Sequence, residues 1–160
     1  MKAAIFCDEE NVGMDSLRTL WSGENRCGKI LQYILDQLQP HQVAEIVAQA
    51  TYSKWHGESP RWLKLARLFE HHYEKNGFTA WWTEEEVDGV MIRDIEDFAL
   101  EPDNEVRIVV LMTGDGDFTE LVEKLQADGK KVWIVSWRGC LSGDLRLAAD
   151  KLIVIDDILD

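Results

Sequence analysis

The sequence is poor in cysteine, and the few cysteines are badly placed for cross-linking. It has three, Cys7, Cys27 and Cys140, and no two of them form a Cys-x-x-Cys pair. An odd number at these spacings argues against both a disulfide framework and a structural zinc site. The pattern favours a reducing compartment, and we expect a cytoplasmic protein.

Long apolar segments, repeats and low-complexity tracts are also absent from the sequence. No run approaches the ~18 apolar residues that a membrane span requires. Met1 and Lys2 lead into only a short apolar stretch before acidic residues, which does not resemble a secretory leader. We therefore expect no membrane partner, and we expect a single domain over residues 1–160.

Positive charge is scarce. Lysine and arginine total 17 against 30 aspartates and glutamates, which gives a formal net charge of −13. This balance counts against generic nucleic-acid binding, whose affinity comes mostly from neutralised phosphates. It leaves open a local basic patch on an acidic body, or an acidic site that binds phosphate through a metal ion.

What the sequence does have is a regular alternation of strand and helix patterns. Continuous apolar runs at 3–7 and 106–112 are typical of parallel strands buried on both faces. We expect further strands at 43–50, 78–82, 131–136 and 152–155, and helices at 24–39, 60–76, 88–101, 117–128 and 142–150. This order predicts an α/β fold, a three-layer α/β/α sandwich with a mainly parallel central sheet.

Four aspartates stand where an expected strand ends or an expected helix begins: Asp8, Asp88, Asp115 and Asp117. In an open α/β sheet the carboxyl ends of the strands share one rim, and ligands bind in the crevice beside it. Clustered carboxylates need a cation, and oxygen ligands suit Mg²⁺ or Mn²⁺. Asp115 and Asp117 are flanked by glycines, which permit positive φ angles. Alternatively, Asp117 only caps its helix, with Glu120 completing a capping box.

Two further polar residues are candidates for this site. Asp94 falls on the apolar stripe of its helix, beside Met91 and Ile95, and an inward-facing acid should be paired or bound to metal. Asn11 follows Asp8 and would contact a carboxylate or a phosphate, or only hold a turn.

A basic and aromatic cluster follows the second strand, with Lys54, Trp55, Arg61 and Lys64 as candidate RNA contacts. Tryptophans in loops stack on bases and nearby cations hold phosphates. Thr113 is a further candidate for a contact on the phosphate side. One cationic helix face is also ordinary in proteins that bind no RNA.

Taken in series, these residues resemble the NYN domain family, the LabA-like proteins of the PIN-like nuclease superfamily. The matching elements run through nearly the whole chain in the right order. They are Phe6-x-Asp8-x-x-Asn11, Tyr52-x-x-Trp55, Val87-Asp88 with Asp94, Thr113-Gly114-Asp115-Gly116-Asp117-Phe118, Gly129-Lys130-Lys131-Val132, and Ser142-x-x-Leu145 leading to Ala149-Asp150 and Ile155-Asp156.

The resemblance implies a Rossmann-like, PIN-like sandwich and an acidic Mg²⁺ or Mn²⁺ site that cleaves RNA phosphodiesters. By position, Asp8, Asp88, Asp115 and Asp117 match the family's acids, and Asp94 matches a second acid of the middle motif. The chain departs from the family at two places. Glu84-Glu85-Glu86 stands where a lysine is frequent, and Gln49-Ala50-Thr51 stands where a basic residue is frequent.

Three classes of function therefore remain open. The first is a metal-dependent ribonuclease. The second is a weakly active or inactive NYN-fold module that binds or assembles with proteins, to which the acidic surface points, and which includes a possible homodimer. The third is another phosphate-processing enzyme. Asp8 argues against a Toprim-like domain, where glutamate is usual, and Asp8-Glu9-Glu10 lacks the Asp-x-Asp of a haloacid-dehalogenase phosphatase.

Overall fold

The computed structural model describes residues 1–15, 18–19 and 25–159. Its centre is a sheet of six strands in the order β5-β4-β1-β6-β7-β8, in which every neighbouring pair is parallel. A separate antiparallel pair, β2 with β3, lies outside that sheet. The strands are β1 Lys2–Asp8, β2 Met14–Asp15, β3 Arg18–Thr19, β4 Glu45–Lys54, β5 Thr79–Thr83, β6 Val106–Met112, β7 Lys131–Ser136 and β8 Lys151–Val154.

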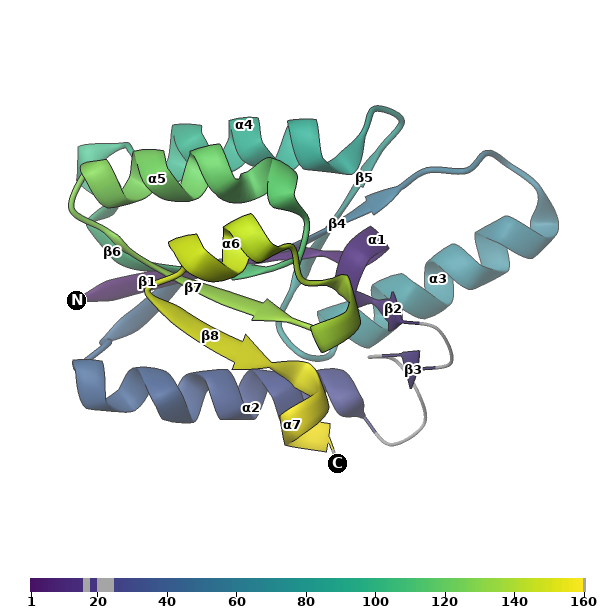
Figure 1. Cartoon of the computed structure of the whole chain (residues 1–160). Helices are drawn as coiled ribbons and strands as arrows, with labels where there is room; N and C mark the ends of the chain where they lie inside the picture. The colour runs from purple at the N-terminus through teal and green to yellow at the C-terminus, as the bar shows by residue number, and fades with distance from the viewer. Residues whose placement is uncertain (16–17, 20–24, 160) are drawn as a thin grey trace.

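Helices cover both faces of the sheet, as Figure 1 shows. One face packs against α2, α3 and α7, and its core includes Ile30 and Ile34 of α2 and Tyr73 of α3. The other face packs against α4, α5 and α6 through residues such as Met91 and Leu121. The helices are α1 Glu9–Val12, α2 Arg26–Leu38, α3 Pro60–Glu74, α4 Val87–Ala99, α5 Thr119–Ala127, α6 Gly143–Ala148 and α7 Ile155–Leu159, and short 3-10 turns are η1 Gln39–His41, η2 Pro102–Asn104, η3 Gly116–Phe118 and η4 Arg138–Cys140.

The middle strands explain why the sheet is parallel and three-layered. In β1, residues 3–8 are all buried, and β6 and β7 are buried nearly throughout. Strands that are apolar on both sides must be covered on both faces, which helical crossovers achieve. The expected α/β/α sandwich is therefore confirmed.

Local signals at helix ends also agree with the structure. The side chain of Ser59 accepts a hydrogen bond from the backbone N–H of Trp62, and Pro60 occupies the first position of α3. Past its other end, Gly77 has a φ of +87°, a conformation that glycine adopts without strain. Ser142 caps α6 in the same way as Ser59 caps α3, through the N–H of Leu145.

Other local predictions were wrong. The short helix α1 follows Asp8 and α7 follows β8, where the sequence predicted no helices. Asp117 does not form a capping box with Glu120, because α5 begins only at Thr119 and Phe118 is its N-cap. Instead, Asp115 caps η3 by accepting a hydrogen bond from the N–H of Asp117.

Within the part of the chain that the structure describes, the helices are too short or too polar to cross a bilayer.

One buried side chain ties the segment after β7 to α1. Trp137 follows β7, is fully buried, and its indole N–H donates a 2.9 Å hydrogen bond to the carbonyl oxygen of Val12. We expect Trp137→Phe to lower the free energy of unfolding by about 2–4 kcal/mol, because it leaves a cavity and an unpaired carbonyl. Urea denaturation would measure it, with Trp81→Phe as control because Trp81 is 55% exposed. Equal losses in the two variants would contradict this role for Trp137.

Candidate metal centre at the carboxyl edge of the sheet

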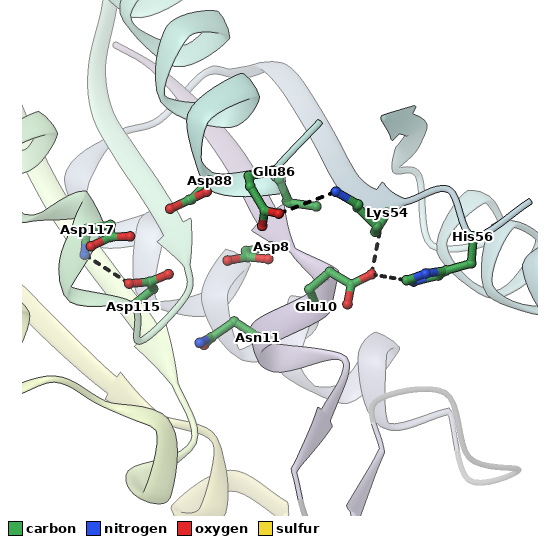
Figure 2. Close-up of a pocket in the computed structure, with 10 residues that line it drawn as sticks. Asp8, Glu10, Asn11, Lys54, His56, Glu86, Asp88, Asp115 and Asp117 are labelled. Carbon is green, nitrogen blue, oxygen red and sulfur yellow. Dashed lines mark hydrogen bonds and ion pairs between the residues drawn. The ribbon is translucent and has the colours of Figure 1, made fainter. Parts of the chain in front are cut away.

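The candidate site lies where the chain reverses its direction across the sheet. From β1 the chain proceeds outward to β4 and β5, and it then returns to β6 on the other side of β1. Such a switch point opens a crevice at the carboxyl ends of the two central strands. A pocket of about 490 Å³ lies there (Figure 2), and its lining includes Asp8, Asn11, Asp88, Asp115 and Asp117.

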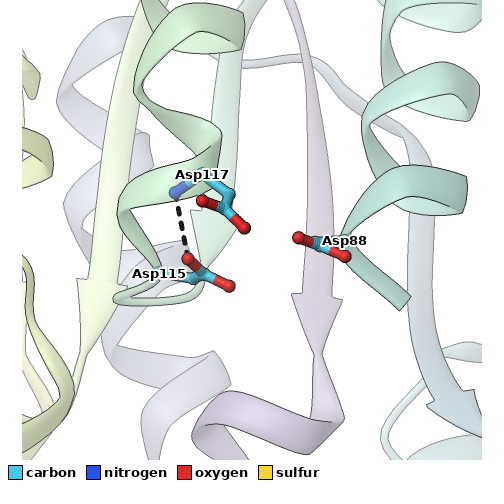
Figure 3. Close-up of side chains that lie close together, drawn as sticks. All are labelled: Asp88, Asp115 and Asp117. Atoms are coloured by element: carbon cyan, nitrogen blue, oxygen red, sulfur yellow. Dashed lines mark hydrogen bonds between the residues drawn. The ribbon is translucent and has the colours of Figure 1, made fainter. Parts of the chain in front are cut away.

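Three of the predicted acids converge, and we call Asp88, Asp115 and Asp117 the aspartate triad. One carboxylate oxygen from each lies within 4.8 Å of the others (Figure 3). The backbone N–H of Asp117 donates a 2.9 Å hydrogen bond to Oδ1 of Asp115, which fixes the turn after β6. Within residues 1–13 and 25–159, no lysine or arginine forms an ion pair with the triad. The three carboxylates are therefore available to a cation.

The carboxylates of the triad repel one another, and this repulsion affects the pKa of Asp117. The pKa of Asp117 is raised above its ordinary value, first by a hydrogen bond shared with the carboxyl group of Asp88 and then by the charges of Asp115 and Asp88. Like charges at this distance favour keeping a proton between two of them. A cation bound between the carboxylates would take the place of that proton.

Asp8 lies in the same pocket but outside the triad. Its side chain is 4% exposed, and burial raises its pKa from the ordinary 3.8 to about 7. Hydrogen bonds from the hydroxyl of Thr113 and the backbone of Asn11 act in the opposite direction, and the charge of Asp115 adds to the rise. Its Oδ1 atom is buried without a hydrogen-bond partner. An orphaned buried carboxylate oxygen is a suitable ligand position for a metal ion.

Thr113 and Asn11 position the acids. The hydroxyl of Thr113 donates to Oδ2 of Asp8 at 3.2 Å and accepts from the N–H of Asp115 at 3.2 Å. Asn11 accepts a 2.7 Å hydrogen bond from the N–H of Gly114. Thr113 is fully buried, so the prediction that it contacts RNA is wrong, because its hydroxyl is enclosed between the two acids it joins.

The glycines of this turn are there for space and not for their backbone angles. Neither Gly114 nor Gly116 has a positive φ. A Cβ atom on Gly114 would collide with the carbonyl oxygen of Cys140 and with Oγ of Ser136. The N–H of Ser142 donates a 2.8 Å hydrogen bond to the carbonyl of Gly114. The turn is therefore packed tightly against the segment before α6, which only glycine allows at position 114.

The rim of the pocket holds residues that sequence reasoning missed. Glu10 accepts a 3.1 Å hydrogen bond from the backbone N–H of Lys54, and its carboxylate lies 3.6 Å from Nε2 of His56. Lys54 extends its ammonium group to within 3.5 Å of Glu86 (Figure 2). Glu10 stands just after a strand end and Glu86 just before a helix start, and these positions are the signal in the sequence that could have identified both residues.

Asp94 does not belong to the pocket lining, and the prediction that it faces inward is wrong. Its side chain is exposed, whereas Met91 and Ile95 on the same helix are buried. Its partner is Tyr52, whose pKa is raised by burial and then by the charge of Asp94 and a hydrogen bond with it. Asp94 therefore lies at the edge of the apolar stripe of α4 and is hydrogen-bonded to the phenol group of Tyr52 in β4.

The remaining RNA candidates lie beside the acidic pocket. Trp55 packs edge to face against Trp62 and Trp82, with ring centroids 6.1 and 5.9 Å apart. Arg61 and Lys64 are exposed on the first turns of α3 and do not line the pocket. Of the basic candidates, only Lys54 is brought to the pocket itself.

Comparison with known proteins agrees with this geometry. The family model described as the NYN domain matches residues 2–156. The chain belongs to the NYN domain family. The resemblance seen in the motifs is thereby confirmed, and the NYN model matches the segment that holds Asp8, Asp94 and the aspartate triad. Proteins with this domain are typically nucleases.

Two individual proteins are similar to this chain, one in sequence and one in structure. The low amplitude and bright protein LabA of Synechococcus elongatus is 32% identical over 96 residues, which is 60% of this chain and 49% of LabA. The match thus spans about half the length of that relative. A crystal structure of a protein of unknown function from Vibrio parahaemolyticus has a TM-score of 0.70 and 26% identity, over 98% of this chain and 93% of the other.

The buried carboxyl group of Asp8 predicts a pH dependence of stability. A pKa raised in the fold means that the protonated acid stabilises the protein below about pH 4, and this contribution is lost as the pH rises through about 7. Without metal, the free energy of unfolding of the wild type should fall by about 2–3 kcal/mol relative to Asp8→Asn between about pH 5 and about pH 8. Denaturant titrations in EDTA at the two pH values would measure it.

Asp103→Asn is the matched control, because Asp103 is an exposed aspartate in η2 that does not line the pocket. This variant should keep the pH dependence of the wild type. A pH profile of Asp8→Asn that runs parallel to the wild type would show that Asp8 does not titrate in this range.

Proposed function

We propose that the protein is a metal-dependent ribonuclease that hydrolyses RNA phosphodiester bonds with Mg²⁺ or Mn²⁺. The observation that carries the proposal is the convergence of one oxygen each from Asp88, Asp115 and Asp117 within 4.8 Å, at the switch point of a parallel sheet. Membership of the NYN family, whose domains are typically nucleases, supports the same reaction class.

The residues of the pocket fit a hard divalent cation. The donors are carboxylate oxygens, which Mg²⁺ and Mn²⁺ prefer, and a partly open pocket leaves room for the waters that Mg²⁺ retains. Asp88, Asp115 and Asp117 would hold the ion, and the unpartnered Oδ1 of Asp8 would complete the set from the neighbouring strand. A bound ion of this kind activates water and stabilises charge on the reacting oxygens of a phosphodiester.

The chain's own residues have defined tasks in this proposal. Thr113 donates a hydrogen bond to Oδ2 of Asp8 and leaves Oδ1 without a hydrogen-bond partner. Asn11 and Thr113 hold the backbone between Gly114 and Asp115, which limits movement of the triad.

Lys54 is the residue best placed to contact the RNA backbone. It lines the acidic pocket and is partly exposed, with its ammonium group 3.5 Å from Glu86. A phosphate in the pocket would compete with Glu86 for this cation. Arg61 and Lys64 on α3 would bind further phosphates of a longer RNA. The ring of Trp55 would contact a base of that RNA.

The ribonuclease proposal predicts metal-dependent cleavage. Purified protein with Mn²⁺ should cleave single-stranded or structured RNA, and EDTA should abolish cleavage. Asp115→Asn should lower the rate by about two orders of magnitude or more, because it removes a ligand charge from the triad. Gel analysis of labelled RNAs would measure both effects.

Asp97→Asn is the matched control, because Asp97 is an exposed aspartate on α4, the helix that also carries Asp88. This variant should cleave like the wild type. A wild type that cuts no RNA faster than Asp115→Asn would refute the proposal. If calorimetry then showed Mn²⁺ binding without turnover, the chain would act as a metal-binding assembly module, which the acidic surface of charge −13 favours.

A second experiment separates the pocket cation from the cations of α3. Lys54→Met should raise the KM for a short RNA about tenfold and leave kcat nearly unchanged, because it removes a phosphate contact. Arg61→Ala with Lys64→Ala should raise the KM only for longer RNAs. Steady-state kinetics with RNAs of two lengths would measure these KM values. An unchanged KM in Lys54→Met would show that Lys54 does not contact the RNA.

A further inference from the structure

A second cavity, of about 690 Å³, lies at the opposite edge of the sheet, where β6, β7 and β8 begin. In Figure 1 this edge is on the side of the N-terminus, away from α1 and the acidic pocket. We call it the basic pocket. Its lining is mainly apolar and consists of Met1, His41, Arg107, Ile108, Gly129, Lys131, Trp133, Asp150 and Lys151.

The charge of the basic pocket is opposite to that of the whole chain. Arg107, Lys131 and Lys151 line it, and Asp150 is its acid. The carboxylate of Asp150 accepts a 2.8 Å hydrogen bond from the N–H of Val132 and lies 4.0 Å from Lys131, so it offsets one of the three cationic side chains and leaves a positive excess. Among the described residues, Arg107 has no ion-pair partner. On a chain of net charge −13, this concentration of cations attracts an anion.

The floor of the basic pocket is aromatic and firmly held. Trp133 is 3% exposed, and Nζ of Lys151 lies 4.7 Å from the centroid of its ring. His41 packs against the same ring edge to face, with centroids 5.4 Å apart. Lys151 also donates a 2.6 Å hydrogen bond to Gln37 of α2. The cation over the ring is therefore fixed in place before any ligand arrives.

We propose that the basic pocket binds a small phosphorylated ligand with an apolar or aromatic body, of the nucleoside monophosphate class. The exposed guanidinium of Arg107 and the ammonium of Lys131 would hold the phosphate group, since charge-assisted hydrogen bonds to phosphate are strong. The exposed side chains of Met1 and His41 would contact the body of the ligand. The volume falls within the range of roughly 300–1,000 Å³ that is usual for small-molecule sites. This site is independent of the proposed ribonuclease activity.

Calorimetry with adenosine monophosphate tests the proposal on the full chain. EDTA in the buffer prevents phosphate from binding through metal ions in the acidic pocket. We expect saturable binding of adenosine monophosphate, and weaker binding of adenosine and of inorganic phosphate, because each lacks one half of the ligand. Arg107→Ala with Lys131→Ala should weaken binding at least about tenfold. Both side chains are exposed, so the double variant should keep its fold.

Lys29→Ala with Arg67→Ala is the matched control, because it removes the same charge from exposed positions on α2 and α3. It should bind adenosine monophosphate like the wild type. Equal weakening in the two double variants would show that only the net charge of the protein matters, and it would overturn the proposal. The absence of binding at millimolar adenosine monophosphate would overturn it too. If a short single-stranded RNA bound in EDTA through Arg107 and Lys131 while adenosine monophosphate did not, the small-ligand site would also be ruled out.

Discussion

The acidic site depends on one buried hydroxyl group. Thr113 lies directly after β6, and it links the carboxylate of Asp8, 105 positions earlier in the chain, to the backbone of Asp115. This contact exists because β1 and β6 are parallel neighbours, with Cys7 opposite Met112. The register of two apolar strands thus sets the distance between acids that come from different motifs. Changes that slip this register would separate Asp8 from the aspartate triad without removing any carboxylate.

Much of the fold followed from the sequence because its central strands are continuously apolar and end in acids. In a parallel sheet such strand ends share one edge, so Asp8, Asp88, Asp115 and Asp117 could be grouped without coordinates. The orientation of single side chains could not be predicted. Asp94 lies beside buried residues in the helical pattern, yet its own side chain is exposed and reaches the hydroxyl group of the buried Tyr52. The burial of Thr113 depends on a neighbour from another strand, which no local pattern reveals.

The structure changes the interpretation of the departure from the family at positions 84–86. Glutamates occupy positions 84–86, where a lysine is frequent, and in the sequence alone this removes positive charge from the site. The structure brings Lys54 from β4 to within 3.5 Å of Glu86. A cation therefore reaches the same rim from a neighbouring strand. Glu10, which accepts from the backbone of Lys54 and lies near His56, ties this side of the rim to α1.

The direction of the helices has a consequence for the acidic rim. Each helix of a parallel α/β fold runs back from the carboxyl end of one strand toward the start of the next, so its first turn lies near that rim. Asp88 belongs to the first turn of α4, and Asp117 comes two residues before α5 begins. The aligned peptide dipoles give such helix ends a partial positive charge of roughly half a unit. The backbone itself thus moderates the repulsion among the carboxylates, and no basic side chain has to occupy the space that a ligand would need.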